Sequence, residues 1–131
     1  MMKMLLVEDS ELIRTRLQAW LRNLVGLNHI ITASTLEQAL LLVRQECPDL
    51  LILDLSLPDG NAINRLKDFK FFAPHMAIAV YSNDASTFTR QKCLQAGAHW
   101  FFDKSGEVSD LIALVQQQLR SHMLRSLNNP T

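Results

Sequence analysis

The chain has 131 residues, 48% of them hydrophobic, and its thirteen basic and thirteen acidic residues give a formal net charge of zero. This is the size of one domain with one substantial core. The balanced charge removes the electrostatic argument for a nucleic-acid or membrane-surface partner, so we expect neither direct nucleic-acid binding nor membrane association.

Cysteine spacing and hydropathy narrow the class of protein further. Cys47 and Cys93 match no zinc or redox spacing and are expected to be reduced, packed thiols. The apolar start ends at Glu8-Asp9, too early for a signal peptide, and no stretch approaches the ~20 apolar residues of a membrane span. We expect a cytoplasmic protein with one domain over residues 1–124 and a frayed tail over 125–131.

The chain begins with a predicted strand and helix. Met4–Val7 is a short apolar strand, and Ser10 offers an N-cap to the helix that follows. The apolar stripe of this helix consists of Ile13, Leu17, Trp20 and Leu24.

A second strand and helix follow. The strand is predicted over His29–Ala33, and Ser34 with Glu37 has the spacing of a capping box for the next helix. The buried stripe of that helix consists of Leu36, Leu40 and Val43, and Pro48 ends it.

The third strand is a continuous apolar run, Leu50–Leu53. Such a run is typical of a strand buried on both faces, as in parallel sheets. Asp54 is its first charged residue, and Pro58 and Gly60 indicate a turn soon after it. A short third helix then carries Ile63, Leu66 and Phe69.

Two more strand–helix pairs complete the chain. Met76–Tyr81 predicts the fourth strand, and a helix from about Ala85 to Ala96 follows, with Gly97 in the position of a C-terminal capping glycine. Ala98–Phe102 predicts the fifth strand, and the last helix runs from about Val108 to Met123. The fourth helix has the weakest apolar stripe of the five.

Five strand–helix units with short connections predict an α/β fold with a parallel sheet covered by helices on both faces. The carboxyl ends of such strands lie side by side, and sites form there. These ends carry Glu8 and Asp9, Asp54, Ser82, and Asp103 with Lys104.

Three converging carboxylates repel one another unless a cation is present. At an effective dielectric near 20, like charges ~4 Å apart repel by about 4 kcal/mol. Carboxylates with waters and a phosphate are the ligands that Mg²⁺ prefers. Lys104 could neutralise a carboxylate or bind a phosphoryl oxygen, and Ser82 could donate to the same kind of oxygen.

This set of residues resembles the receiver domain of two-component response regulators. The resemblance rests on Val7-Glu8-Asp9, Asp54 with Pro58 and Gly60, Ser82 and Lys104, and it covers about residues 3 to 122. It implies a doubly wound, flavodoxin-like, five-stranded sheet of order 2-1-3-4-5 with five helices.

The same resemblance implies a role for each residue. Asp54 would accept a phosphoryl group from a phosphohistidine of a sensor histidine kinase or a histidine phosphotransfer protein. Glu8, Asp9, Asp54 and the backbone carbonyl of Ser56 would hold Mg²⁺. Lys104 would stabilise charge on the transferring group.

Two further residues match the family's conformational switch. Ser82 and Phe101 occupy the hydroxyl and aromatic switch positions, through which phosphorylation would bias a loop and the fourth helix. The output partner is unknown, and the surface of the fourth helix, fifth strand and last helix is the predicted partner-binding or dimerising face, with Trp100 as a candidate anchor.

The sequence departs from the family pattern at several positions. Glu8 stands for the first Asp, Phe101 has no hydroxyl, Asn83 is larger than the usual residue after the switch serine, and Ser105 stands where many receivers have Pro.

The sequence also allows other roles for these residues and for the whole chain. Ser82 could cap the fourth helix, Lys104 could be a solvated loop residue, and Phe101 and Trp100 could be ordinary core residues. For the whole chain, one alternative is a receiver-like scaffold that accepts no phosphate. Another is an aspartyl-nucleophile phosphatase, although Ser56 stands where such enzymes need a second carboxylate. We expect a switch rather than an enzyme, either stand-alone or part of a longer regulator.

Overall fold

A computed structural model describes residues 2–24 and 27–128. Its main sheet has five parallel strands in the order β2-β1-β3-β6-β7, which confirms the predicted order 2-1-3-4-5. The strands are β1 (Met2–Val7), β2 (Leu27–Ala33), β3 (Leu50–Leu53), β6 (Ala77–Ser82) and β7 (Trp100–Asp103).

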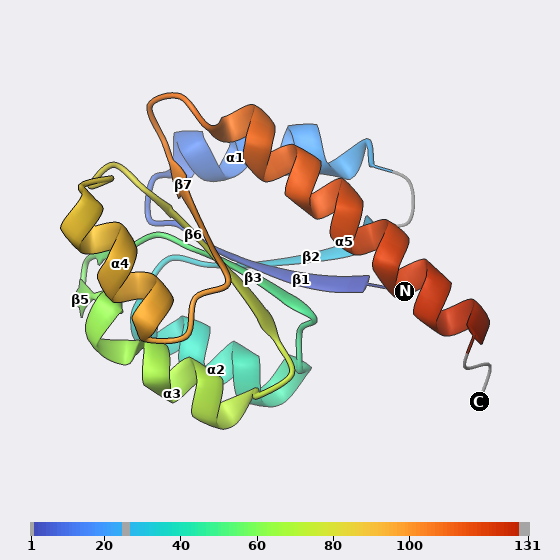
Figure 1. The fold of residues 1–131 in the computed structure, drawn as a ribbon, viewed down its shortest axis with the longest axis horizontal. Coiled ribbons are helices and arrows are strands. Elements are labelled where there is room, and N and C mark those ends of the chain that lie inside the picture. The colour runs from blue at the N-terminus through green and yellow to red at the C-terminus, as the bar shows by residue number, and fades with distance from the viewer. Residues whose placement is uncertain (1, 25–26, 129–131) are drawn as a thin grey trace.

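Helices cover both faces of this sheet (Figure 1). Helices α1 and α5 lie on one face, and α2, α3 and α4 lie on the other. Their bounds are α1 (Glu11–Arg22), α2 (Leu36–Glu46), α3 (Leu66–Phe72), α4 (Thr87–Gln95) and α5 (Val108–Asn128). Each face therefore has its own apolar core.

Successive side chains of β1 pack alternately into the two cores on either face of the sheet. Leu5 and Val7 pack into the core on the α2–α4 side, whereas Met4 and Leu6 pack on the α1–α5 side. Successive side chains of a strand point to opposite faces, so a central strand between two helical layers must be apolar throughout. The continuous run Leu50–Leu53 is buried for this reason.

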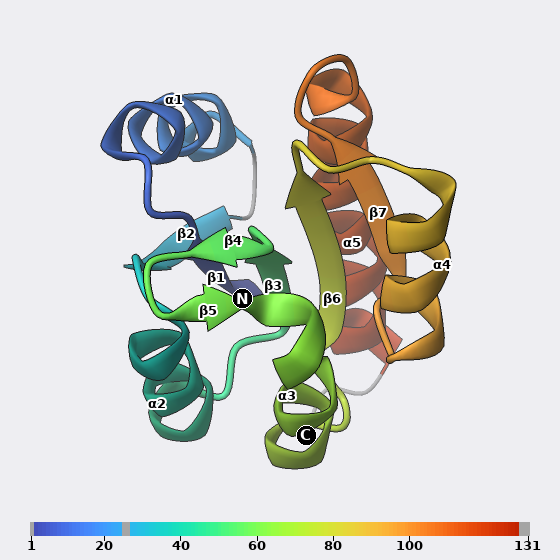
Figure 2. The ribbon, with the colours of Figure 1, turned by 90° about the vertical axis from the view of Figure 1, so that its left-hand side faces the viewer.

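A short segment after β3 was not predicted. β4 (Ser56–Leu57) and β5 (Gly60–Asn61) form a two-stranded antiparallel hairpin beside the end of β3, before a 3-10 turn over Ala62–Arg65 (Figure 2). Gly60 adopts a φ of +144°, a backbone conformation that residues with a side chain rarely adopt. The Pro58 and Gly60 signals thus correspond to a hairpin that follows directly after the central strand β3.

The structure corrects the predicted stripe of α1. Trp20 is 46% exposed, and Leu21 is fully buried in its place. Leu21 lies one helical turn from the buried Leu17, at the four-residue spacing that keeps two side chains on one face.

The predicted capping box of α2 is also wrong by one residue. Thr35 is the N-cap, and its Oγ1 accepts from the N–H of Gln38 at 3.1 Å. The carboxylate of Asp59, from the β4–β5 turn, accepts from the N–H groups of Leu36 and Glu37 at 2.8 and 3.0 Å. Of the two donors of the predicted box, the N–H of Glu37 thus donates to a distant carboxylate, and that of Ser34 donates to Gln38 Oε1 at 3.0 Å. The bonds from Leu36 and Glu37 lower the pKa of Asp59.

Two helix ends differ from prediction. α4 begins at Thr87, after an N-cap at Ser86, so it is shorter than the predicted helix. α5 continues to Asn128 instead of ending near Met123. The predicted frayed tail over 125–131 is therefore helical as far as Asn128, and its last three residues lie outside the described part of the chain.

Over the described residues, no helix is both long enough and apolar enough to span a bilayer.

Candidate functional site

Four of the predicted site residues lie at the carboxyl end of the sheet, each at the end of a different strand. Glu8 follows β1, Asp54 follows β3, Ser82 ends β6 and Lys104 follows β7. The N–H of Asp54 donates to the carbonyl of Val7 at 3.0 Å, and that of Lys104 donates to Ser82 at 3.0 Å. The backbone of each residue is therefore held by the neighbouring strand, which fixes where its side chain starts.

Lys104 lies between two buried carboxylates. Its Nζ is 2.6 Å from Glu8 Oε1 and 3.2 Å from Asp54 Oδ2, and its side chain is only 7% exposed. Burial alone would lower the pKa of Lys104, but the hydrogen bond that its ammonium donates to Glu8 and the charge of Asp54 outweigh it, so the pKa is raised. Lys104 is thus a buried, charged ammonium and not a solvated loop residue.

Glu8 is the most deeply buried acid of the site, at 1% exposure. Burial and hydrogen bonding with Asp54 raise its pKa, and these effects outweigh the opposite effect of Lys104. A carboxylate held at such a site has a strong affinity for any additional positive charge.

Three carboxylates gather beside this lysine. Glu8, Asp9 and Asp54 each offer one oxygen, and these oxygens lie within 4.8 Å of one another, with Asp9 exposed and the other two buried. Hard oxygen donors open to solvent on one side fit a divalent cation that keeps part of its water shell. The residues present therefore suit a divalent metal.

The site opens into a cavity of about 220 Å³. The residues that line it are Glu8, Asp9, Ser10, Ile13, Asp54, Ser56, Ser82, Asn83, Asp84 and Lys104. All the predicted catalytic and metal-binding residues are in this set, and Phe101 is not.

Two serines contribute differently to this cavity. Ser82 is 3% exposed, and its Oγ accepts from the N–H of Asp84 at 3.1 Å. Ser86 caps α4, so the hypothesis that Ser82 is the cap is wrong. Ser56 is exposed, and its N–H donates to Asp54 Oδ1 at 3.3 Å, which holds one oxygen of that carboxylate.

The acid at position 84 lines the cavity but turns toward α4. Asp84 Oδ2 accepts from the hydroxyl of Thr89 at 2.8 Å, and Oδ1 accepts from the N–H of Ser86 at 3.3 Å. These bonds, that of Thr89 foremost, lower the pKa of Asp84. The segment after Ser82 is therefore tied to the first turn of α4.

Two of the three aromatic residues of β7, Phe101 and Trp100, face opposite layers. Phe101 is 8% exposed and packs on the α2–α4 side, with the guanidinium of Arg90 4.9 Å from its ring centre. Trp100 is half-buried and packs against the core on the α1–α5 side. Core packing thus accounts for both residues, while the switch role of Phe101 and the anchor role of Trp100 stay predictions.

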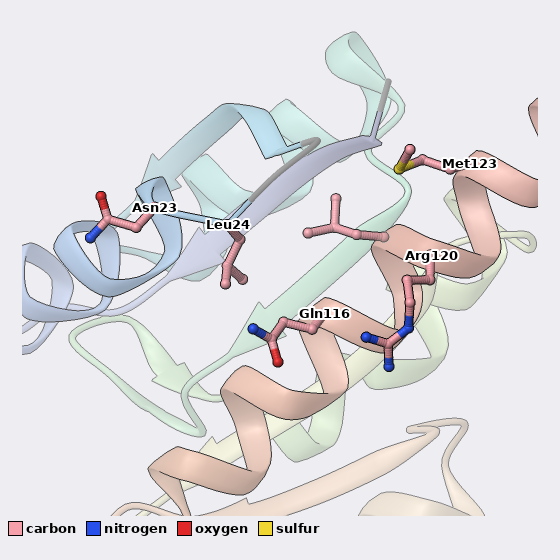
Figure 3. A pocket seen from close by; sticks show the side chains of 6 residues that line it. Asn23, Leu24, Gln116, Arg120 and Met123 are labelled. Carbon is pink, nitrogen blue, oxygen red and sulfur yellow. The ribbon is translucent and has the colours of Figure 1, made fainter.

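A separate hollow of about 350 Å³ lies between the end of α1 and α5 (Figure 3). Its lining residues are Asn23, Leu24, Gln116, Leu119, Arg120 and Met123. Among the described residues, no acid or nucleophile lines it, and the lining therefore lacks the groups of the acidic cavity.

Comparisons with known proteins agree with this geometry. The family model for the response regulator receiver domain matches residues 4–116. The KDP operon transcriptional regulatory protein KdpE of Escherichia coli (strain K12) is 32% identical over 130 residues, which cover 99% of this chain and 56% of that protein. The chain thus spans about half the length of the curated relatives that it matches.

Solved structures share the fold. The beryllofluoride-activated NtrC4 receiver domain dimer is 28% identical, with a TM-score of 0.80 over 91% of this chain and 96% of that one. A response regulator protein from Burkholderia pseudomallei, with a phosphorylated aspartic acid, calcium ion and citrate, is 22% identical, with a TM-score of 0.79 over 100% of this chain and 76% of that one.

Proposed function

This chain belongs to the family of response regulator receiver domains, and from that premise we propose that Asp54 accepts a phosphoryl group from a phosphohistidine. The observation that carries this proposal is the position of Asp54, which shares the Lys104 ammonium with Glu8 at the floor of an acidic cavity. Phosphoryl transfer needs mainly positioning and charge stabilisation, and these residues supply both.

The proposed step balances as an in-line displacement at phosphorus. An oxygen of Asp54 forms the new P–O bond, and the P–N bond to the donor imidazole breaks, leaving its electron pair on nitrogen. The ammonium of Lys104 then exchanges its contact with Asp54 for a phosphoryl oxygen. The buried hydroxyl of Ser82 lines the same cavity and can donate to another phosphoryl oxygen.

We propose Mg²⁺ as the metal of this site. Glu8, Asp9, Asp54 and the backbone carbonyl of Ser56 would hold it, and when bound it would neutralise charge on the phosphoryl oxygens. The support is the donor set itself, three carboxylate oxygens within 4.8 Å beside a solvent-open cavity.

The partners follow from the proposed role. A sensor histidine kinase or histidine phosphotransfer protein would supply the phosphoryl group in the cytoplasm. An output partner or domain would respond, through the face formed by α4, β7 and α5. We assign the receiver domain to residues 1–124.

The alternatives are less well supported. A scaffold that accepts no phosphate has no need for Lys104 buried between Glu8 and Asp54. An aspartyl-nucleophile phosphatase needs an acid–base carboxylate where Ser56 stands.

Mass spectrometry after incubation with acetyl phosphate and Mg²⁺ tests the proposal. We expect one phosphoryl group per chain in the wild type and in Asp59→Asn, a nearby acid outside the cavity lining, and none in Asp54→Asn or without the metal. Incorporation that survives Asp54→Asn would overturn the assignment. Continuous turnover of a phosphomonoester would favour the phosphatase instead.

A further inference from the structure

Helix α4 is held to the sheet by little apolar burial. Within Thr87–Gln95, Thr89 and Cys93 are the buried residues, while Phe88 and Leu94 are 69% and 48% exposed. Where apolar burial is small, polar contacts decide where an element lies. The polar contacts of this helix therefore decide where it lies against the sheet.

One side chain of α4 makes most of its long-range polar contacts. Arg90 Nη2 donates to Glu107 Oε1 at 2.7 Å, and Nη1 donates to the carbonyl of Phe101 at 3.5 Å. Its Nε donates to Ala85 at 3.3 Å, and its guanidinium lies 4.9 Å from the centre of the Phe101 ring. Arg90 thus joins α4 to β7 and to the loop that precedes α5.

The acid that Arg90 contacts shapes the loop that carries Lys104. Glu107 Oε1 also accepts from the backbone N–H of Asp103 at 2.8 Å, so the carboxylate spans the turn on either side of the lysine. Asp103 Oδ1 accepts from the N–H and hydroxyl of Ser105 at 2.9 and 2.8 Å, which closes the same turn from within. The pair with Arg90 and the bond from Asp103 lower the pKa of Glu107, so it is ionised.

We propose that Arg90 and Glu107 are positioning residues that make the placement of Lys104 depend on the placement of α4. The proposal rests on the proposed function, because it concerns the rate at which Asp54 accepts a phosphoryl group. A partner that draws α4 away from β7 would break the Arg90–Glu107 pair and loosen the Lys104 turn. Where partner binding also shifts the equilibrium of phosphorylation, linkage requires phosphorylation to alter the affinity for that partner by the same factor; this reciprocity does not extend to the rate.

A purely structural role for Arg90 predicts something different. The pair is about one-third exposed at each partner, and exposed ion pairs contribute little to stability. If Arg90 only stabilises the fold, its removal should lower the melting temperature and change phosphorylation equally whether or not Lys104 is present. If it acts through Lys104, the two effects on phosphorylation should not add.

A double-mutant cycle separates these roles. The measurement is the initial rate of phosphorylation by acetyl phosphate for the wild type, Arg90→Ala, Lys104→Ala and the double variant. We expect Arg90→Ala to reduce the rate about fivefold in the wild type and to leave it unchanged in the Lys104→Ala background. The matched control is Lys92→Ala on the same helix, whose ammonium lies 5.2 Å from the Phe88 ring, away from the loop; it should leave the rate unchanged.

Hydrogen exchange supplies a readout that needs no phosphorylation. Arg90→Ala should speed amide exchange over residues 103–107, because Glu107 loses the partner that orients it toward the N–H of Asp103, and Lys92→Ala should not. Equal rate losses in both backgrounds, or unchanged exchange over 103–107, would overturn the proposal. If the wild type accepts no phosphoryl group, the proposed function fails, and the exchange result alone decides whether the Arg90–Glu107 link exists.

Discussion

Removal of the Lys104 charge should destabilise the protein strongly. Lys104→Met keeps an unbranched side chain of similar length but removes the ammonium that lies between Glu8 and Asp54. Both carboxylates are almost fully buried, so neither can turn to solvent for compensation. The variant is therefore left with two facing acids and no cation from the chain at their contact.

The size of this loss can be worked from the two distances. At an effective dielectric near 20, unit charges 2.6 and 3.2 Å apart attract by about 6 and 5 kcal/mol. Desolvation of the ammonium offsets several kcal/mol of that attraction. We therefore expect a net loss of about 3–5 kcal/mol in the free energy of unfolding, as when one partner of a buried pair is removed.

The loss should depend on pH in a defined direction. The pKa of Glu8 is already raised, and without Lys104 it rises further, so ionised Glu8 destabilises the variant at neutral pH. As the pH falls toward the ordinary pKa range of carboxyl groups, Glu8 takes up a proton, and the variant loses less of its free energy of unfolding relative to the wild type. At alkaline pH the opposite limit applies. Because folding raises the pKa of Lys104, the wild type loses the stability that the ammonium provides only as the pH rises through the pKa of Lys104 in the folded protein.

Urea denaturation of metal-free protein at several pH values measures these effects. The double variant Lys104→Met with Asp54→Asn should recover much of the loss, because one of the two facing charges is gone. Lys92→Met, at an exposed position, should be close to wild type. A deficit that does not change with pH, or a double variant as unstable as the single one, would refute the electrostatic account.

Three further changes test other parts of the structure. Asp9→Asn should raise the melting temperature of the metal-free protein at low salt by relieving carboxylate repulsion, and should reduce the stabilisation by added Mg²⁺; calorimetry with and without the metal decides. Ser82→Ala should leave Asp54 phosphorylation possible but abolish the accompanying change in hydrogen exchange over residues 83–104, and a change that persists would exclude the switch role. Gly97→Ala should lower the free energy of unfolding by about 1–2 kcal/mol, because φ is +117° and a Cβ would lie 2.8 Å from a side-chain carbon of Lys70. Gly106→Ala, with open space around the position, should leave it unchanged in urea denaturation.

The parallel sheet and its two helical layers could be predicted from local patterns and topology rules, whereas the order of the strands was implied by the resemblance to receiver domains. The apolar run Leu50–Leu53 has no polar face, so it must lie at the centre, and right-handed crossovers then place the helices. The errors arose where two local solutions compete. Trp20 and Leu21 are both apolar and adjacent, and packing against the neighbouring core decides which one is buried.

The acidic cluster could also be predicted, because parallel strands bring their carboxyl ends together whatever their separation in the sequence. Contacts between distant polar residues could not be predicted in the same way. Asp59 caps a helix that begins 23 residues earlier, and Arg90 pairs with Glu107 across 17 residues. No short sequence spacing predicts such pairs, because they depend on where the fold places a hairpin or a loosely packed helix.

Backbone hydrogen bonds at the strand ends hold the residues of the acidic cavity to the sheet. The amides of Glu8 and Asp54 each donate to a neighbouring strand, so their protection depends on the centre of the sheet and not on any loop. Helix α4 contributes few buried groups to that centre. The sheet therefore holds the residues of the acidic cavity, while α4, which lies on the proposed partner-binding face, contributes little to that framework. A protein engineer could replace the exposed residues of α4, with Arg90 retained, to redirect the signal to a new recipient while leaving the acidic cavity unaltered.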